Sequence, residues 1–162
     1  MKTLFFAFLM GSAILAVPAQ TQTEATIEGL DGRTAKVSTS TMKQMPRNSV
    51  TVTDPKTKAE QHYEGVLLSE VLGKVDAPTG KTLHGVELRD YVEVIASDDY
   101  RVVFSLAELD QPTHSNKVLL ADTLDGQPLN ATQGPFKLIA PEDTRPERWV
   151  RMVSRIHIVQ AR

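Results

Sequence analysis

The chain of 162 residues has 18 basic and 20 acidic side chains, a formal net charge of −2 at pH 7, and no cysteine. A mildly acidic protein lacks the broad electrostatic attraction for nucleic acid, so we expect no nucleic-acid partner. The absence of cysteine excludes disulfides, thiolate nucleophiles, CxxC redox pairs and cysteine-ligated zinc or iron–sulfur centres.

The N-terminus has the pattern of a secretory signal peptide. Lys2 precedes an apolar, uncharged run from Leu4 to Val17, and Val17-Pro18-Ala19 supplies small residues for cleavage after Ala19. A membrane-spanning helix needs about 20 apolar residues, and this run is shorter. We therefore expect a signal peptide over residues 1–19 and an exported protein, periplasmic or secreted, with no membrane insertion after cleavage.

The residue pattern in the next part of the chain predicts short strands and one short helix. Turn residues and alternating apolar residues predict strands over Thr26–Leu30, Thr34–Val37, Ser49–Thr53 and Gln61–Glu64. The first two flank Asp31-Gly32, a pair that favours a hairpin turn. Ser38 or Thr39 is a suitable cap for a helix that runs to Met45, where Pro46 ends it.

The rest of the chain continues this pattern. A short amphipathic helix is predicted from Gly65 to Val75, and Ser105 with Glu108 has the spacing of a capping box. Further strands are predicted over Tyr91–Ile95, Tyr100–Phe104, Val118–Ala121, Phe136–Ala140 and Arg155–Val159. Many short strands with few short helices indicate one compact α+β domain over residues 20–162.

Five segments, in order, carry a resemblance to a known family. They are YEGVLLSEVL (Tyr63–Leu72), DDYRVVFSLAELD (Asp98–Asp110), VLLADTLDGQPL (Val118–Leu129), GPFKLIAPED (Gly134–Asp143) and RWVRMVSRIHI (Arg148–Ile158). From about Tyr63 onward the sequence resembles the oxidoreductase molybdopterin-binding domain, the fold of the sulfite oxidase family. The resemblance implies a mixed sheet with short helices that, in the enzymes, buries a molybdenum–pterin cofactor.

The resemblance also implies a cysteine that ligates molybdenum in the segment before Tyr63. Here that position falls near Val52 or Thr53, and neither side chain is a soft sulfur ligand. We therefore expect no cofactor and no catalytic residue, with molybdopterin suggested by the resemblance alone. The four histidines have no ligand spacing, and no metal site is predicted.

A basic segment near the C-terminus is the candidate ligand-binding site. It contains Arg145, Arg148 and Arg151 around Trp149. If Pro146 begins a helix, Arg148, Arg151 and Arg155 share one face, and guanidinium groups there suit phosphate or carboxylate. The resemblance places Arg148 and Arg151 beside the family's pterin pocket. The competing interpretations are ion pairs with nearby acidic residues for the arginines, and core packing for Trp149.

Three functions stay open on the sequence alone. The leading hypothesis is an exported, non-catalytic binding or sensory module that takes an anionic small molecule. The second is a molybdenum oxidoreductase with a ligand other than cysteine. The third is an interaction subunit that binds an exported or membrane-bound protein partner through a sheet edge and has no small ligand.

Overall fold

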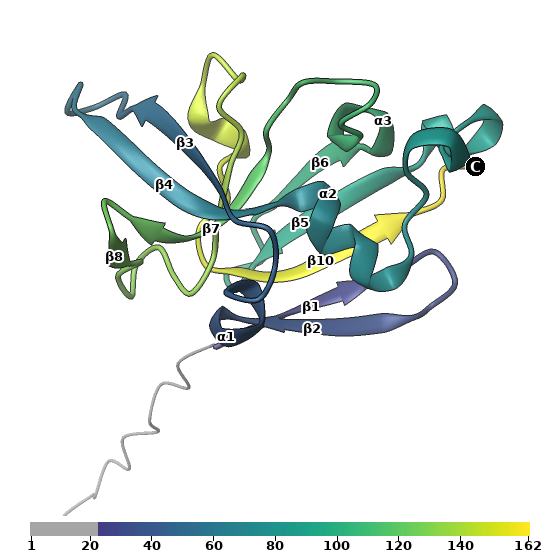
Figure 1. Ribbon diagram of the computed structural model, residues 1–162, viewed down its shortest axis with the longest axis horizontal. Helices are drawn as coiled ribbons and strands as arrows, with labels where there is room; N and C mark the ends of the chain where they lie inside the picture. Colours follow the sequence, from purple (N-terminus) through teal and green to yellow (C-terminus); the bar gives the residue numbers. More distant parts are fainter. Residues whose placement is uncertain (1–22) are drawn as a thin grey trace, which may run out of the picture.

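The computed structural model describes residues 23–162, in which ten strands form a mixed sheet and an antiparallel sheet. The first sheet has the order β2-β1-β10-β5-β6 (Figure 1). Its strands are β1 (Glu24–Glu28), β2 (Thr34–Ser38), β5 (Tyr91–Ala96), β6 (Arg101–Ser105) and β10 (Val153–Val159). β1 and β10 run parallel, and the other neighbours are antiparallel.

The second sheet has the order β3-β4-β7-β8, and β9 also pairs with β7. Its strands are β3 (Asn48–Thr53), β4 (Glu60–Leu67), β7 (Leu119–Leu124), β8 (Gln127–Pro128) and β9 (Lys137–Ile139). β7 is the central strand, so it brings side chains of β4 and β9 onto one surface although 70 or more residues separate them.

The helices are short. The α-helices are α1 (Thr39–Met42), α2 (Leu68–Leu72) and α3 (Leu106–Leu109). The 3₁₀-helices are η1 (Gly73–Val75), η2 (Gly80–Thr82), η3 (Gly85–Arg89) and η4 (Pro146–Arg148). None of the helices of residues 23–162 has the length and apolar character that crossing a membrane requires.

Two apolar clusters hold the sheets together. In the larger one, Leu68, Val71 and Leu72 of α2 pack on one face of the first sheet, and Figure 1 shows α2 crossing in front of β5 and β10. The smaller cluster lies on the second sheet; it consists of Val50, Val52, Tyr63, Leu67, Leu119, Ala121 and Ile139. Trp149 packs against both clusters, so it lies where the two cores meet.

Several predicted elements are confirmed. β1 and β2 form the predicted hairpin, although β1 begins and ends two residues earlier than expected. The Ser38 hydroxyl accepts a hydrogen bond from the Thr41 backbone N–H at 3.2 Å, and the Ser105 hydroxyl accepts one from the Glu108 backbone N–H at 3.1 Å. The two helices begin where these caps predict, because each cap satisfies a free N–H of the first turn.

Three predicted helices are wrong in extent. The helix expected to run to Met45 ends at Met42. Residues 65–67 belong to β4 rather than to α2, because they pair with β7 and Gly65 lies against Ala121. A Cβ atom on Gly65 would lie 2.1 Å from the Leu120 carbonyl oxygen, so this close strand crossing requires glycine. The helix considered from Pro146 ends at Arg148, because Trp149 has an extended backbone and the chain enters β10 at Val153, in agreement with the strand predicted over Arg155–Val159.

Candidate functional site

A buried lysine lies on the second sheet, close to its central strand. Lys137 is the first residue of β9 and is flanked by the buried Phe136 and Leu138, and only 7% of it is exposed. Its Nζ donates a hydrogen bond to the Tyr63 hydroxyl of β4 at 2.7 Å. The same nitrogen lies 4.6 Å from the centroid of the Tyr63 ring and 5.8 Å from that of Trp149.

Lys137 has no carboxylate partner among residues 23–162. None of the salt bridges found there includes it, and its hydrogen-bond acceptor, Tyr63, is a neutral phenol. Burial, together with the charges of Asp54 and Asp125, raises the pKa of Tyr63 to about 12. A buried lysine is almost always paired, because removing an ammonium group from water is unfavourable.

The surroundings of Lys137 lower its pKa. Burial lowers the pKa of Lys137 to about 8, the positive charge of Arg151 also lowers it, and Asp54 offsets part of the effect. The Tyr63 hydroxyl donates in turn to the Gln61 Oε1 at 2.9 Å, and Gln61 Nε2 reaches Asp54 at 3.4 Å. The ammonium group is therefore connected to this carboxylate through two neutral side chains rather than by an ion pair.

A cavity of about 230 Å³ is related to this lysine through Trp149, which lines the cavity and lies beside the Lys137 ammonium group. We refer to it as the Trp149 cavity, and it is lined by Ala96, Asp98, Tyr100, Pro146, Glu147, Trp149 and Arg151. The Trp149 indole N–H donates to the Ala140 carbonyl at 2.9 Å, which fixes the ring, and the Tyr100 hydroxyl donates to the Glu147 carbonyl. Trp149 therefore both packs in the core and forms a wall between the cavity and Lys137.

The predicted arginines occupy different environments. Arg148 donates to Asp143 through Nε at 2.8 Å and to Glu108 through Nη2 at 2.9 Å, and its guanidinium carbon lies 4.2 Å from the Phe104 ring centroid. These hydrogen bonds, chiefly that to Asp143, raise the pKa of Arg148. Arg148 thus forms the kind of ion pair that the sequence left as its alternative role.

The other two arginines are exposed and form no salt bridge within residues 23–162. Arg151 lines the Trp149 cavity, whereas Arg145, at the start of η4, does not. Arg155 lies on β10 and does not line the Trp149 cavity. The structure therefore brings together Arg151 and Trp149 from the prediction, and it adds Lys137 and Tyr63, which the sequence did not identify. We call these four residues the Lys137 cluster.

The position expected for the family's cysteine is in the same region. Val52 belongs to the smaller apolar cluster together with Tyr63, and the neighbouring Thr53 is exposed. Neither side chain is a thiolate, and residues 23–162 contain no group of three or more His, Asp or Glu side chains that could hold a metal ion. The cationic Lys137 and Arg151 further disfavour a metal cation. These residues do not fit a molybdenum centre ligated by the protein, but they fit an anion.

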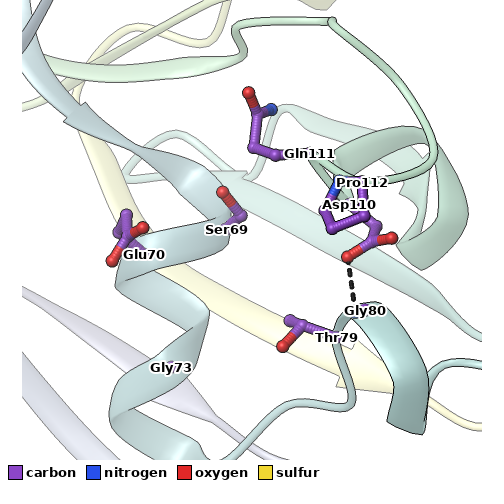
Figure 2. A pocket seen from close by; sticks show the side chains of 8 residues that line it. All are labelled: Ser69, Glu70, Gly73, Thr79, Gly80, Asp110, Gln111 and Pro112. Carbon is purple, nitrogen blue, oxygen red and sulfur yellow. Dashed lines mark hydrogen bonds between the residues drawn. The ribbon is translucent and has the colours of Figure 1, made fainter.

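A second hollow, of about 280 Å³, lies between α2 and the segments that contain η2 and the end of α3. Figure 2 shows that the Asp110 carboxylate points toward the backbone of Gly80, whereas Glu70 points away from it. Asp110 is buried and accepts hydrogen bonds from the Gly80 N–H and the Thr113 hydroxyl, each at 2.7 Å. Its charge is therefore used to hold the fold together, and this hollow is the weaker candidate.

Comparison with known proteins identifies the family. The sequence model of the oxidoreductase molybdopterin binding domain matches residues 14–162, and the chain belongs to this family. The match includes the N-terminal hairpin and α1, which the five sequence segments did not reach. Comparison with curated proteins finds no match.

A solved structure shows the same fold. The crystal structure of the sulfane dehydrogenase SoxCD from Paracoccus pantotrophus is similar, with a TM-score of 0.65 and 16% sequence identity. The similarity covers 90% of this chain but only 40% of that chain. The predicted α+β fold of the sulfite oxidase type is confirmed, and at this identity the likeness concerns the fold alone.

Proposed function

We propose that this protein is an exported, non-catalytic binding module that takes up a small anion at the Lys137 cluster. The observation that carries this proposal is a buried ammonium group with no carboxylate partner among residues 23–162. A carboxylate, phosphate or sulfate group held by Arg151 in the Trp149 cavity would face Lys137 across the Trp149 ring and would supply a negative charge close to the buried ammonium group. Such an anion would receive charge-assisted hydrogen bonds from Arg151.

The aromatic residues support a ligand that carries an apolar part beside the anionic group. Trp149 and Tyr100 line the Trp149 cavity, and Pro146 adds a further apolar wall. A planar ring or short chain would be in contact with these side chains, while its anionic group reaches Arg151. The cavity volume of about 230 Å³ limits the ligand to a small molecule.

The non-catalytic part of the proposal rests on the donor chemistry. The family's enzymes, by resemblance, need a soft sulfur ligand, and the chain has no cysteine. The exported location, periplasmic or secreted, rests on the apolar N-terminal run, which lies outside the described residues.

A thermal-shift screen tests the proposal. Phosphate, sulfate, small carboxylates and pterin-like anions are added to the wild type, to Lys137→Met and to Arg151→Gln. A ligand that binds the folded state raises its melting temperature. Arg151→Gln should weaken binding by about 1.5–3 kcal/mol, the range for a hydrogen bond to a charged group. Lys137→Met should weaken it by less, because Lys137 acts on the anion through its charge and not through a direct hydrogen bond.

Arg89→Gln provides the control, because Arg89 is an exposed arginine of η3 outside the cluster. It should respond to the anions as the wild type does. If no anion raises the melting temperature of the wild type, or if Lys137→Met responds equally, the anion-binding proposal is wrong. The protein-interaction subunit then becomes the better hypothesis.

A further inference from the structure

Only one face of the first sheet is covered by the core. Side chains such as Ile27, Val94 and Ile156 point toward α2 and belong to the larger apolar cluster. The alternate side chains of the same strands point to the opposite face. On that second face, the apolar residues Tyr91, Val103 and Val159 belong to neither apolar cluster, whereas Ile95 is buried. Figure 1 shows α2 only on the first face.

The second face carries a basic row that crosses the whole sheet. Strand register places one residue of each strand side by side in this row: Lys36, Thr26, Arg155, Ile95 and Arg101. The three cations in it are exposed, and the row contains no acidic residue. Lys36 and Arg101 reach only acids outside the row, Glu24 at 3.1 Å and Asp99 at 3.7 Å.

An acidic row runs next to it, two residues further along each strand. Register places Thr34, Glu28, His157, Glu93 and Val103 side by side in this row. His157 lies between two carboxylates, and its Nδ1 is 4.0 Å from Glu93 Oε2. Two residues of a strand span about 6.7 Å, so the two rows are close and parallel.

Two parallel rows of opposite charge make a face that is complementary to itself. Consider two copies stacked face to face, with a two-fold axis in the plane between them that runs parallel to the rows and midway between them. This axis places the basic row of each copy on the acidic row of the other copy. Such a contact is isologous, which is the commonest arrangement in protein dimers. Val103 lies within the acidic row and is exposed, so it adds apolar contact, and packed sheets are about 10 Å apart.

We infer that this face is a dimer interface at which two copies of the chain stack sheet on sheet. The complementary rows determine the relative orientation of the copies, and Arg155 and Glu93 are central to it. None of the row residues lines the Trp149 cavity, so this inference is independent of the proposed function. Because the charged side chains are near solvent in the free chain, salt should weaken the association.

Sedimentation equilibrium of the mature chain tests the inference first without substitutions. We expect a monomer–dimer equilibrium in 50 mM salt whose dissociation constant rises at least tenfold in 500 mM salt. A chain that is monomeric at 200 µM in 50 mM salt would overturn the inference, as would a dimer whose dissociation constant does not depend on salt.

A pair of charge-reversal variants tests the geometry. One variant carries Lys36→Glu with Arg155→Glu and makes both rows acidic; the other carries Glu28→Lys with Glu93→Lys and makes both rows basic. Each variant alone should be monomeric, and an equal mixture should form one-to-one heterodimers. Lys56→Glu with Lys58→Glu, on the β3–β4 turn, is the control and should dimerise like the wild type. Failure of two folded variants to associate when mixed, or dimers of either variant alone, contradicts the proposed interface.

Discussion

The Nζ atom of Lys137 donates a hydrogen bond to the Tyr63 hydroxyl at 2.7 Å, and this contact joins β9 to β4 across the central strand of the second sheet. Both residues are buried. Tyr63 stays neutral because burial raises its pKa to about 12, so it solvates the ammonium group without neutralising it. This uncompensated charge is the basis of the predictions about stability and binding that follow.

The pH dependence of stability should report the buried charge. The pKa of Lys137 is about 8 in the folded chain, below its ordinary value of 10.5. Between pH 8 and 10.5 the unfolded chain binds more protons at Lys137 than the folded chain does, so the free energy of unfolding rises with pH. Below pH 8 the destabilisation caused by burying the charged lysine is present in full. Relative to Lys137→Met, the free energy of unfolding of the wild type should rise by on the order of 2 kcal/mol from pH 7.5 to 9.5.

Urea unfolding in a buffer without small anions measures this difference. The measurements stop at pH 9.5 because Tyr63 has the opposite effect at higher pH. Above about pH 10 the Tyr63 phenol loses its proton in the unfolded chain before it does so in the folded chain, so the free energy of unfolding falls as pH increases. A difference between wild type and Lys137→Met that does not change with pH would show that Lys137 keeps its ordinary pKa.

The two neighbouring arginines should differ sharply in their effect on stability. Arg148→Gln leaves Asp143 and Glu108 without their shared cation, and we expect a loss of about 2 kcal/mol. Arg151→Gln should change stability by less than about 0.5 kcal/mol, because Arg151 is exposed and forms no salt bridge within residues 23–162. Chemical unfolding of both variants at pH 7 gives the comparison, and equal losses would contradict these assigned roles.

The sequence predicted most strands because alternation and turn residues are local signals. It misplaced the helix after Tyr63, because the apolar residues of 65–67 suit either structure and only pairing with β7 selects the strand. It also missed the Lys137–Tyr63 contact, which joins residues 74 positions apart. A signal for Lys137 was present, since a lysine within the apolar run Phe136–Ala140 predicts a buried cation.

Trp149 and Arg151 were predicted as site residues, but their geometry was not. A shared helical face for the arginines required a helix that continues from Pro146 to Arg155, and the helix that forms ends at Arg148. Arg148 differs from Arg151 because it pairs with Asp143 and Glu108, and Glu108 lies 40 positions from Arg148 in the sequence. Tertiary ion pairs of this kind have no local sequence pattern.

Metal content should distinguish a binding module from a molybdenum enzyme. Protein produced in a host that makes the molybdenum cofactor should purify with far less than one molybdenum per chain, because no thiolate can ligate the metal. Elemental analysis after gel filtration measures the ratio. A ratio close to one would instead support an oxidoreductase with a ligand other than cysteine.

The export prediction concerns the N-terminus. The small residues Val17 and Ala19 predict a mature chain that begins at Gln20, a position outside the described residues. Mass spectrometry of protein from the exported fraction should find this terminus, with or without cyclisation of Gln20. A membrane-held product that still begins at Met1 would be inconsistent with cleavage.

The most direct test of anion binding at Lys137 is to titrate this side chain by NMR. In the free wild type its pKa should be about 8, and Arg151→Gln should raise it, because the Arg151 charge contributes to the lowering. With a saturating concentration of the most strongly stabilising anion, the pKa should return toward 10.5, because a bound negative charge favours the ammonium form. A Lys137 pKa that is the same with and without the anion would contradict the account.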